Sequence, residues 1–577
     1  MKPTTGPADS SPLPAAAPKR RSFLKGAAVG AASLAAPWPA RAQVAPAPPP
    51  SPYTEPWRDE LQAEKPLEPV QSLSPAPGRL PVAGEVGRAA HQAWDRFPPL
   101  KLYEIHSAEY MLKWHKDLPA VMTWGFNDRC PGPMFHARYG EPILVRISNE
   151  LQQLGQGFGS PEISIHLHNM HTPSESDGFP VDWWSPTDFG PTLTGPGHFK
   201  DQHYPMVYAG VDQYGGIGDP REALGTLWYH DHRLDFTAQN TYRGLSGFFL
   251  AFDDVDNGDE HDLSSPTALR LPSGDFDQPF VLADKRFTPD GVALSFDPFN
   301  GDGFLGDKMT VNGRIQPFYK VSRRKYRLRL LDAGPARMYD LQLRLGSPTG
   351  PVQSFQYIAN DGNLLPAPLT MNSVRLAVAE RADIVFDFSR FEKGSELFLV
   401  NRLEQLDGRK PEKDYLKNPV PILKFEVDRD ATGDDVDESR VPAVLRALPD
   451  MDQPVAARRS FTFDRTNGAW AVNSKLFKNI PRASPKKGTA EIWTLRNESG
   501  GWAHPIHIHL EEGRILTRNG KPPPPHERGR KDVFYLGPNE TVQVYLRFRD
   551  FTGKYVMHCH NTVHEDHSMM VRYDITS

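Results

Sequence analysis

Ten of the chain's 20 histidines gather in four short clusters, two in its first half and two near its end. The clusters read HLH, YHDH, HPIHIH and HCHNTVH. On a β-strand, residues two apart point to the same face about 6 to 7 Å from each other, so an HxH pair can aim two imidazoles at one metal ion. Four pairs supply eight imidazoles, twice what one tetrahedral ion accepts, and therefore indicate more than one metal ion. The clustered histidines are His166, His168, His230, His232, His504, His507, His509, His558, His560 and His564.

The same strand period predicts a second kind of site on the opposite face of the last two clusters. Cys559 lies between His558 and His560 and must point away from them. His504 precedes His507 by three residues, an odd separation that turns it to the other face as well. Two histidines, a cysteine and a weak axial methionine define a blue-copper centre. The residues that fit this description are His504, Cys559, His564 and Met569.

Simpler interpretations of each cluster compete with metal binding. A lone HxH pair is more often an amphipathic pair of residues with no metal, because histidine is common at partly exposed positions. Four pairs with a correctly placed cysteine and methionine argue against that interpretation for the whole set. Zinc stays open for any single cluster, but a thiolate together with a thioether favours copper.

The elements that would position these residues are β-strands. Runs such as GEPILVRISNEL and TVQVYLRFRD alternate apolar and polar residues, and 57 prolines and 46 glycines favour strands and turns over long helices. The 577 residues are too many for one core, and acidic, apolar-poor stretches near residues 260 and 430 divide them. We therefore predict an all-β chain with blocks at 82–258, 259–432 and 433–577, each of the size of a sandwich or barrel. The first and last blocks hold the clusters.

Charge and the N-terminus bear on partners and location. Charged residues make up 24% of the chain and the net charge is -5, so we expect neither nucleic acid nor an anionic membrane as a partner. Residues 1–42 resemble a twin-arginine signal peptide, with the pair Arg20 and Arg21 before an apolar run and an AxA-like end. We expect export from a bacterial cytoplasm to the periplasm or beyond, and no membrane span, because no other run reaches about 20 apolar residues. The Pro-rich stretch 43–81 reads as a linker or arm.

The four clusters, in this order, resemble those of the multicopper oxidases. The stretches HLHNMHTPSESDGFPVDWW, TLWYHDHRLDFTAQNTYRGLSGFFL and GRKDVFYLGPNETVQVYLRFRDFTGKYVMHCH are most similar to the branch of bacterial spore-coat laccases and bilirubin oxidases. The resemblance covers most of the chain beyond about residue 95 and is most specific in the ligand motifs. It implies three cupredoxin domains, each a Greek-key β-sandwich, with metal bound between the first and the third.

The resemblance also implies a ligand set for four copper ions: one type 1, one type 2 and two type 3. The type 1 copper maps to His504, Cys559, His564 and Met569, and the type 2 copper to His166 and His507. As a ligand, Cys559 would not form a disulfide with Cys130, which we expect to be a free thiol. The type 3 pair maps to His168, His230, His232, His509, His558 and His560.

The family's reaction joins one-electron oxidation of a donor near His564 to the four-electron reduction of dioxygen to water. The resemblance implies that electrons cross Cys559 to its neighbours His558 and His560. Asp177 and Glu565 match acidic positions that deliver protons in the similar branch. The alternative for both acids is an ordinary structural hydrogen-bond network.

The donor is less constrained by the sequence. We expect a laccase-like monomer that acts on diphenols, other aromatic donors or bilins. The alternative is a metal-ion oxidase for Cu(I) or Mn(II); the 13 methionines include no Met-rich insert of the kind that selects Cu(I), and Glu511 and Glu512 are too indefinite a signal for Mn(II). A non-enzymatic electron carrier or a copper nitrite reductase would have no use for eight paired imidazoles.

Overall fold

The computed structural model describes residues 49–152 and 157–577. The predicted signal peptide at 1–42 lies outside these residues. Within them, no helix is both long enough and apolar enough to cross a membrane. The described residues form six sheets in three pairs, and the predicted all-β class with three Greek-key sandwiches is confirmed.

The first pair of sheets forms between residues 101 and 252. One sheet has the order β2-β1-β4-β6 and the other β3-β8-β7-β5. In each sheet one pair of strands is parallel, β1 with β4 and β3 with β8, which is the crossing that a Greek key requires. The strands are β1 (Lys101–Leu112), β2 (Val121–Phe126), β3 (Gly132–Arg138), β4 (Ile143–Asn149), β5 (Ile165–His168), β6 (Phe199–Tyr204), β7 (Thr226–Asp231) and β8 (Ser246–Phe252).

The second pair has the orders β11-β10-β9-β13-β19-β16-β17 and β12-β21-β20-β14-β15, with β18 on β14. Its core is the largest apolar cluster and includes Leu328, Leu341 and Phe425. The strands are β9 (Asp277–Lys285), β10 (Lys308–Val311), β11 (Arg314–Ile315), β12 (Phe318–Ser322), β13 (Lys325–Asp332), β14 (Tyr339–Leu345), β15 (Val352–Gln353), β16 (Phe355–Asn360), β17 (Asn363–Met371), β18 (Val374–Leu376), β19 (Arg381–Asp387), β20 (Glu396–Leu403) and β21 (Tyr415–Arg429).

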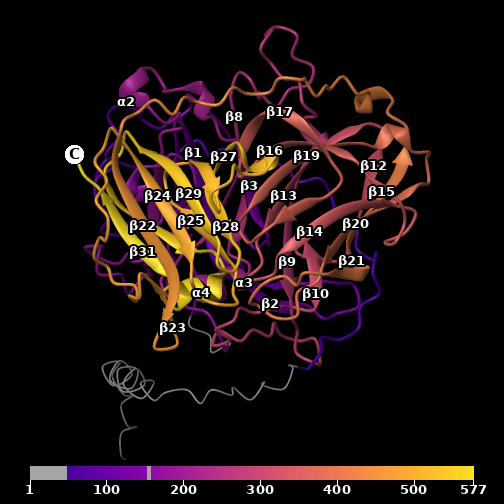
Figure 1. The fold of residues 1–577 in the computed structure, drawn as a ribbon, viewed down its shortest axis with the longest axis horizontal. Coiled ribbons are helices and arrows are strands. Elements are labelled where there is room, and N and C mark those ends of the chain that lie inside the picture. Colours follow the sequence, from indigo (N-terminus) through magenta and orange to yellow (C-terminus); the bar gives the residue numbers. More distant parts are fainter. Residues whose placement is uncertain (1–48, 153–156) are drawn as a thin grey trace, which may run out of the picture. The chain divides into compact units, whose positions relative to one another are not determined.

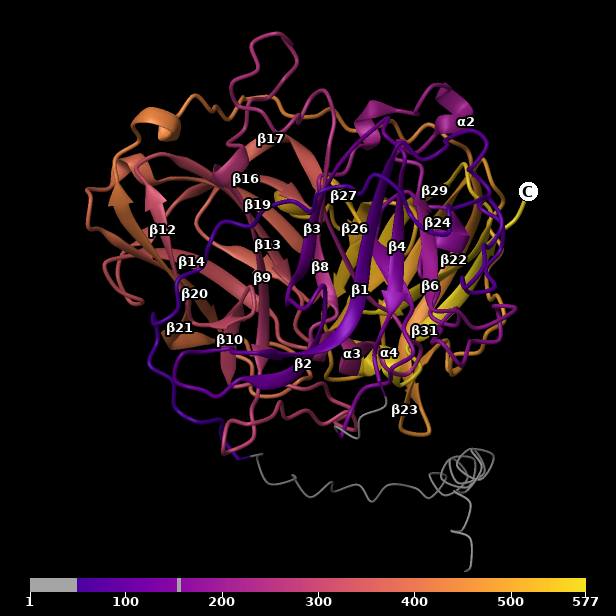
Figure 2. The same ribbon diagram turned by 180° about the vertical axis from the view of Figure 1, so that it is seen from behind.

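The third pair has the orders β23-β22-β24-β29-β26-β27 and β28-β25-β30-β31. Figure 1 shows these strands beside those of the middle block, and Figure 2, from behind, brings β1, β4 and β6 to the front. The strands are β22 (Val455–Thr466), β23 (Ala469–Val472), β24 (Thr489–Asn497), β25 (His504–Ile508), β26 (Gly513–Arg518), β27 (Arg530–Lys531), β28 (Val533–Leu536), β29 (Thr541–Phe548), β30 (Gly553–Cys559) and β31 (Met570–Ile575).

Short helices join the first block to the last. Helix α3 lies beside α4 (Figure 1), and the amide of Ala238 in α3 donates a 3.0 Å hydrogen bond to the carboxylate of Asp566 in α4. The amide of His564 contacts the Asn561 side chain, which caps the start of α4. The helices are α2 (Val211–Tyr214), α3 (Thr237–Arg243) and α4 (Thr562–Asp566), with 3₁₀ turns η1 (Ser174–Ser176), η2 (Pro220–Glu222), η3 (Gly274–Phe276), η4 (Phe388–Arg390), η5 (Gly433–Asp435) and η6 (Pro525–Glu527).

The described part of the predicted arm, residues 49–81, lies along the first two blocks. Glu60 pairs with Phe318 of the second block, whereas Val70 pairs with Leu102 of the first. The predicted block boundary at 258/259 falls between β8 and β9, and the boundary at 432/433 falls between β21 and β22. Both block boundaries stay predictions.

Candidate metal centres

Strand register brings the histidine clusters of the first and last blocks face to face. On the antiparallel pair β5–β7, His166 lies opposite His230. On the antiparallel pair β25–β30, His507 lies opposite His558 and Ile506 opposite Cys559. All ten clustered histidines are at most 1% exposed, so their polar rings require partners inside the protein.

Three imidazoles converge through their Nε2 atoms. His509 Nε2 lies 3.2 Å from His232 Nε2 and 3.3 Å from His558 Nε2. The opposite ring nitrogens bind carboxylates: His509 Nδ1 is 2.7 Å from Asp177, and Nδ1 of His232 and of His558 are 2.9 and 3.0 Å from Glu565. We call this set the His509 group.

A second trio consists of His168, His230 and His560, each with a ring nitrogen within 4.8 Å of the others. His168 uses Nε2 to reach Asp532 at 2.7 Å, and His230 uses Nδ1 to reach the carbonyl of Asp231 at 2.8 Å. His168 Nδ1, His230 Nε2 and both ring nitrogens of His560 have no hydrogen-bond partner among the described residues. We call this set the His560 group.

His166 and His507 face each other between the two trios, with Nε2 atoms 3.4 Å apart. His166 Nδ1 donates to the carbonyl of Asp177, and His507 Nδ1 lies 3.2 Å from both the carbonyl and the carboxylate of Asp532. A carbonyl only accepts hydrogen bonds, so each Nδ1 carries the hydrogen and each Nε2 presents a lone pair.

Facing lone pairs are the main evidence for metal ions in these groups. With Nδ1 protonated, no hydrogen is available between the Nε2 atoms of His166 and His507. The Nε2 atoms of His232 and His558 also lack a hydrogen, because their Nδ1 atoms donate to the ionised carboxylate of Glu565. Two lone pairs at such distances repel unless a cation lies between them. Nitrogens bound at about 2.0 Å to one tetrahedral ion are about 3.3 Å apart, which fits the observed spacings.

A separate site lies on the other face of β30. Cys559 Sγ is 3.4 Å from His504 Nδ1 and 3.6 Å from His564 Nδ1, and these two nitrogens are 3.1 Å apart. His504 Nε2 binds Ser499 Oγ at 2.8 Å, and Ser499 Oγ in turn donates to Asn497 Oδ1 at 2.7 Å. The hydroxyl therefore accepts from His504, so Nδ1 of that ring is again a lone pair.

Met569 is fully buried beside this site. Its amide donates to the carbonyl of His564 at 3.0 Å, and its carbonyl accepts from the amide of Cys559 at 3.0 Å. These two hydrogen bonds hold the loop after α4 against the end of β30. Cys559 and Met569 therefore lie at the two ends of one hydrogen-bonded loop.

Burial keeps these groups uncharged in the absence of a cation. Desolvation lowers the pKa of His504 to about 3 and raises the pKa of the Cys559 thiol well above its usual range. A bound cation would favour the thiolate instead, since the thiolate is the metal ligand. Burial also lowers the ring pKa of His166, His168, His230, His232, His507, His509, His560 and His564.

The two predicted acids lie on either side of the His509 group. Burial raises the pKa of Asp177 well above its usual range. Burial acts the same way on Glu565, but the imidazoles of His558 and His232 outweigh it and hold that pKa well below the usual range. The two carboxyl groups therefore favour opposite protonation states although both contact the same trio of rings.

Asp532 and Arg381 are functional candidates that the sequence patterns did not indicate. Asp532 is fully buried and binds His168 and His507, while Arg381 from β19 donates to its two carboxylate oxygens at 3.0 and 2.6 Å. The middle block thus reaches the histidines although it supplies none of them. Asp532 follows a basic pair in the run RKDVF, and that local pattern is the signal that could have drawn attention to it.

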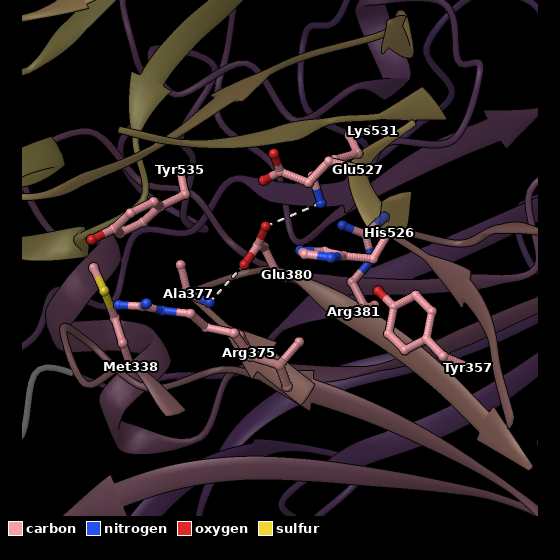
Figure 3. Close-up of a pocket in the computed structure, with 11 residues that line it drawn as sticks. Met338, Tyr357, Arg375, Ala377, Glu380, Arg381, His526, Glu527, Lys531 and Tyr535 are labelled. Carbon is pink, nitrogen blue, oxygen red and sulfur yellow. Dashed lines mark hydrogen bonds and ion pairs between the residues drawn. The ribbon is translucent and has the colours of Figure 1, made fainter. Parts of the chain in front are cut away.

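Arg381 also lines a pocket between the middle and last blocks (Figure 3). Glu380 crosses it, bound to the amide of Ala377 at 2.7 Å and to Lys531 at 3.0 Å. Its volume of about 60 Å³ has room for a few water molecules but not for an aromatic substrate.

Comparison with known proteins gives consistent matches. Two family models, both described as multicopper oxidase, match this chain, one at residues 111–192 and the other at residues 448–577. The chain is 34% identical over 485 residues to bilirubin oxidase from Albifimbria verrucaria, across 82% of this chain and 76% of that one. It is 32% identical over 526 residues to a laccase from Bacillus subtilis (strain 168), across 82% and 94%. The crystal structure of the McoA multicopper oxidase from the hyperthermophile Aquifex aeolicus superposes with a TM-score of 0.67 at 25% identity, across 83% and 97%.

Proposed function

This chain belongs to the multicopper oxidase family, and on that basis we propose that it is a laccase-like enzyme that oxidises small aromatic donors. Family membership makes it a copper protein and an oxidoreductase that uses dioxygen. The observation that carries the proposal is the facing lone pairs of His166 and His507, because two nitrogens that face each other at 3.4 Å without a hydrogen between them require a cation.

We assign four copper ions to these groups. The His509 group and the His560 group would each hold one ion of the type 3 pair, and His166 with His507 would hold the type 2 ion. Bound copper supplies one-electron oxidation of the donor and four-electron reduction of dioxygen to water. The type 1 ligands would be His504, Cys559, His564 and Met569.

The surrounding residues fix which nitrogen of each ring is free. Asp177 holds the Nδ1 hydrogens of His166 and His509, and Glu565 holds those of His232 and His558. Such outer contacts orient a ligand and raise its basicity. We propose that the same two carboxyl groups deliver protons to dioxygen as it is reduced, because both touch rings of the His509 group.

The two kinds of site are connected by one strand. Cys559 is bonded through the main chain to both His558 and His560, which belong to the His509 and His560 groups. An electron that arrives at the Cys559 thiolate therefore reaches either trio without leaving consecutive residues of β30 and its end.

The metal-ion alternative gains no support from the two glutamates that the sequence offered for it. Glu511 and Glu512 are buried. Glu511 is bound to Arg549 at 2.8 Å, and Glu512 binds Asn363 at 2.8 Å and also contacts Asn169. Neither carboxylate is therefore available at the surface for a hydrated Mn(II) ion.

Oxygen uptake by the copper-loaded protein tests the proposal. A phenol, a bilin, Cu(I) and Mn(II) are supplied in turn, and the organic donors are expected to support uptake. Absence of uptake with all four donors in protein that holds four coppers would contradict it. In Cys559→Ser, the blue absorption should disappear while copper at the other groups remains; a variant that stays blue would refute the type 1 assignment.

We also propose that the chain is an exported monomer whose first 42 residues are removed, in line with the basic and apolar pattern of that segment. N-terminal sequencing of the protein from the periplasm or the medium, together with its mass in solution, tests both points. An intact N-terminus on exported protein would contradict cleavage.

A further inference from the structure

An electron donor cannot touch His564 directly. The ring is fully buried, and the indole of Trp470 packs on it with ring centroids 4.0 Å apart. Its Nε2 atom donates a 3.3 Å hydrogen bond to the carbonyl of Asp302. Trp470 is itself only 2% exposed. A donor must therefore reach the proposed type 1 site through another side chain.

Trp502 connects the buried rings to the surface. It is partly exposed, and its ring meets Trp470 edge-on with centroids 5.4 Å apart. Its Nε1 atom donates to Asp302 Oδ1 at 3.0 Å, which fixes the indole in place. It also precedes His504 by two residues, so both a ring contact and a short length of main chain link it to the site.

Arg465, near the end of β22, lies over both indoles. Its guanidinium is 4.7 Å from the Trp470 centroid and 4.9 Å from the Trp502 centroid. It is exposed and donates to the carbonyl of Gly468 at 3.2 and 2.6 Å. Among residues 49–152 and 157–577, no carboxylate forms an ion pair with it. Asp302 attracts it only from beyond ion-pair distance, so the exposed guanidinium can still bind an anion from solvent.

Two loops of the middle block border Trp502. Arg409 stacks at 4.9 Å from the Trp502 centroid, but its charge is matched by Asp302, 2.9 Å away. The same loops carry Phe299 and Leu406, which are 84% and 75% exposed. We call Trp502, Arg465 and Arg409 the Trp502 face; it combines an aromatic edge with one guanidinium that forms no ion pair among the described residues.

We propose that the Trp502 face binds the electron donor and selects phenols that carry a carboxylate. The proposal rests on the laccase-like function proposed above and narrows its substrate class. The aromatic ring of the donor packs on the Trp502 edge, and its carboxylate pairs with the Arg465 guanidinium, whose planar fork suits that group. Trp470 then lies between the donor and His564.

The chemistry balances with dioxygen as the oxidant. Each phenol loses one electron through Trp502 and Trp470 and gives its hydroxyl proton to solvent water, which leaves a phenoxyl radical. Four phenols together supply four electrons, and four protons from solvent accompany them, so one dioxygen becomes two water molecules. The carboxylate is unchanged and serves only to position the ring.

A matched pair of donors isolates the charge contact: 4-hydroxy-3-methoxybenzoate and its methyl ester. In Arg465→Gln, the ratio of the KM for the acid to the KM for the ester should rise about fivefold, the upper range for an exposed ion pair. Arg465→Lys should restore most of the affinity for the acid. Arg79→Gln is the matched control, since Arg79 is another exposed arginine, 3.5 Å from Asp95, and it should change neither KM.

Binding to the copper-free protein gives a second readout that does not depend on turnover. The acid should quench tryptophan fluorescence at lower concentration in the wild type than in Arg465→Gln, and added salt should weaken binding of the acid but not of the ester. An unchanged KM and an unchanged quenching curve for the acid in Arg465→Gln would overturn the proposal. Failure of both donors to support oxygen uptake would instead count against the laccase-like function, and the quenching curves would still decide whether Arg465 binds the carboxylate.

Discussion

Replacing Asp532 with asparagine should weaken copper binding at His168 and His507 while the fold survives. The carboxylate accepts from His168 Nε2 at 2.7 Å and lies 3.2 Å from His507 Nδ1. It also accepts two hydrogen bonds from Arg381, at 3.0 and 2.6 Å. Asparagine keeps one acceptor oxygen but replaces the other with an NH₂ group. That NH₂ group must face either the Arg381 guanidinium or a histidine N–H, so two hydrogen-bond donors meet.

The size of the effect follows from these contacts. Loss of an outer partner of a ligand histidine reduces metal affinity or activity about 10- to 100-fold, or about 1.4 to 2.8 kcal/mol. Removing one partner of a buried ion pair costs about 3 to 5 kcal/mol of stability. The lower end applies here because Arg381 still donates to the carbonyls of Thr226, Ala379 and Asp361 at 3.0 to 3.2 Å.

The assay is copper per chain during titration with a competing chelator, followed by blue absorption and oxygen uptake. Asp532→Asn should lose copper at about 10- to 100-fold lower chelator concentration than the wild type, with its blue absorption kept. Asp340→Asn is the matched control, because Asp340 is a buried carboxylate 2.9 Å from Arg402 with no ligand histidine bound to it. If both variants melt at lower temperature but retain copper as the wild type does, the positioning role of Asp532 is refuted.

Three further predictions concern protons and charge. Glu565→Gln should slow oxygen uptake about 100-fold at unchanged blue absorption. The reason is that the carboxyl group that contacts the ring of His558 can no longer exchange a proton. Oxygen uptake at the wild-type rate would exclude proton delivery by Glu565. The copper-free protein should lose stability as the pH falls from 6.5 to 5, because the pKa of His504 has its ordinary value in the unfolded chain but is about 3 in the folded protein. The expected loss in the free energy of unfolding is about 2 kcal/mol at pH 5, measured by denaturant unfolding. Asp550→Asn should lower the unfolding free energy by about 2 kcal/mol at pH 7. Burial raises the pKa of Asp550, but hydrogen bonds from His171 and the amides of Asp212 and Gly210 outweigh it and depress that pKa to about 2. The difference in unfolding free energy between variant and wild type should therefore shrink as the pH falls below 4 toward 2.

Much of the fold could be predicted because its signals are local. Alternation of apolar and polar residues marks a strand, and the parity of positions on one strand separates neighbours such as Cys559 and His558. In the structure Cys559 lies with His504 and His564, whereas His558 lies with His232 and His509. Both facts follow from the period of a single strand.

The surroundings of the site could not be predicted in the same way. Arg381 begins a strand of the middle block and meets Asp532, which lies 151 positions later in the chain, and no local pattern connects them. Trp470 and Asp302 cover His564 from two other segments. The short helix α4 also departs from the expected strands and turns, and its five residues position both His564 and Glu565.

The eight paired histidines come equally from two blocks, four from the first and four from the last, and this division bears on how the protein unfolds. His166 and His507 face each other across 341 positions of sequence, whereas the first and last blocks each have their own apolar core. Copper bound at these histidines would therefore cross-link the two blocks, and it would add to the stability of their contact in proportion to the logarithm of free copper concentration. Removal of copper should separate one cooperative transition into two, with the blocks parting at a lower temperature than the one at which either sandwich melts.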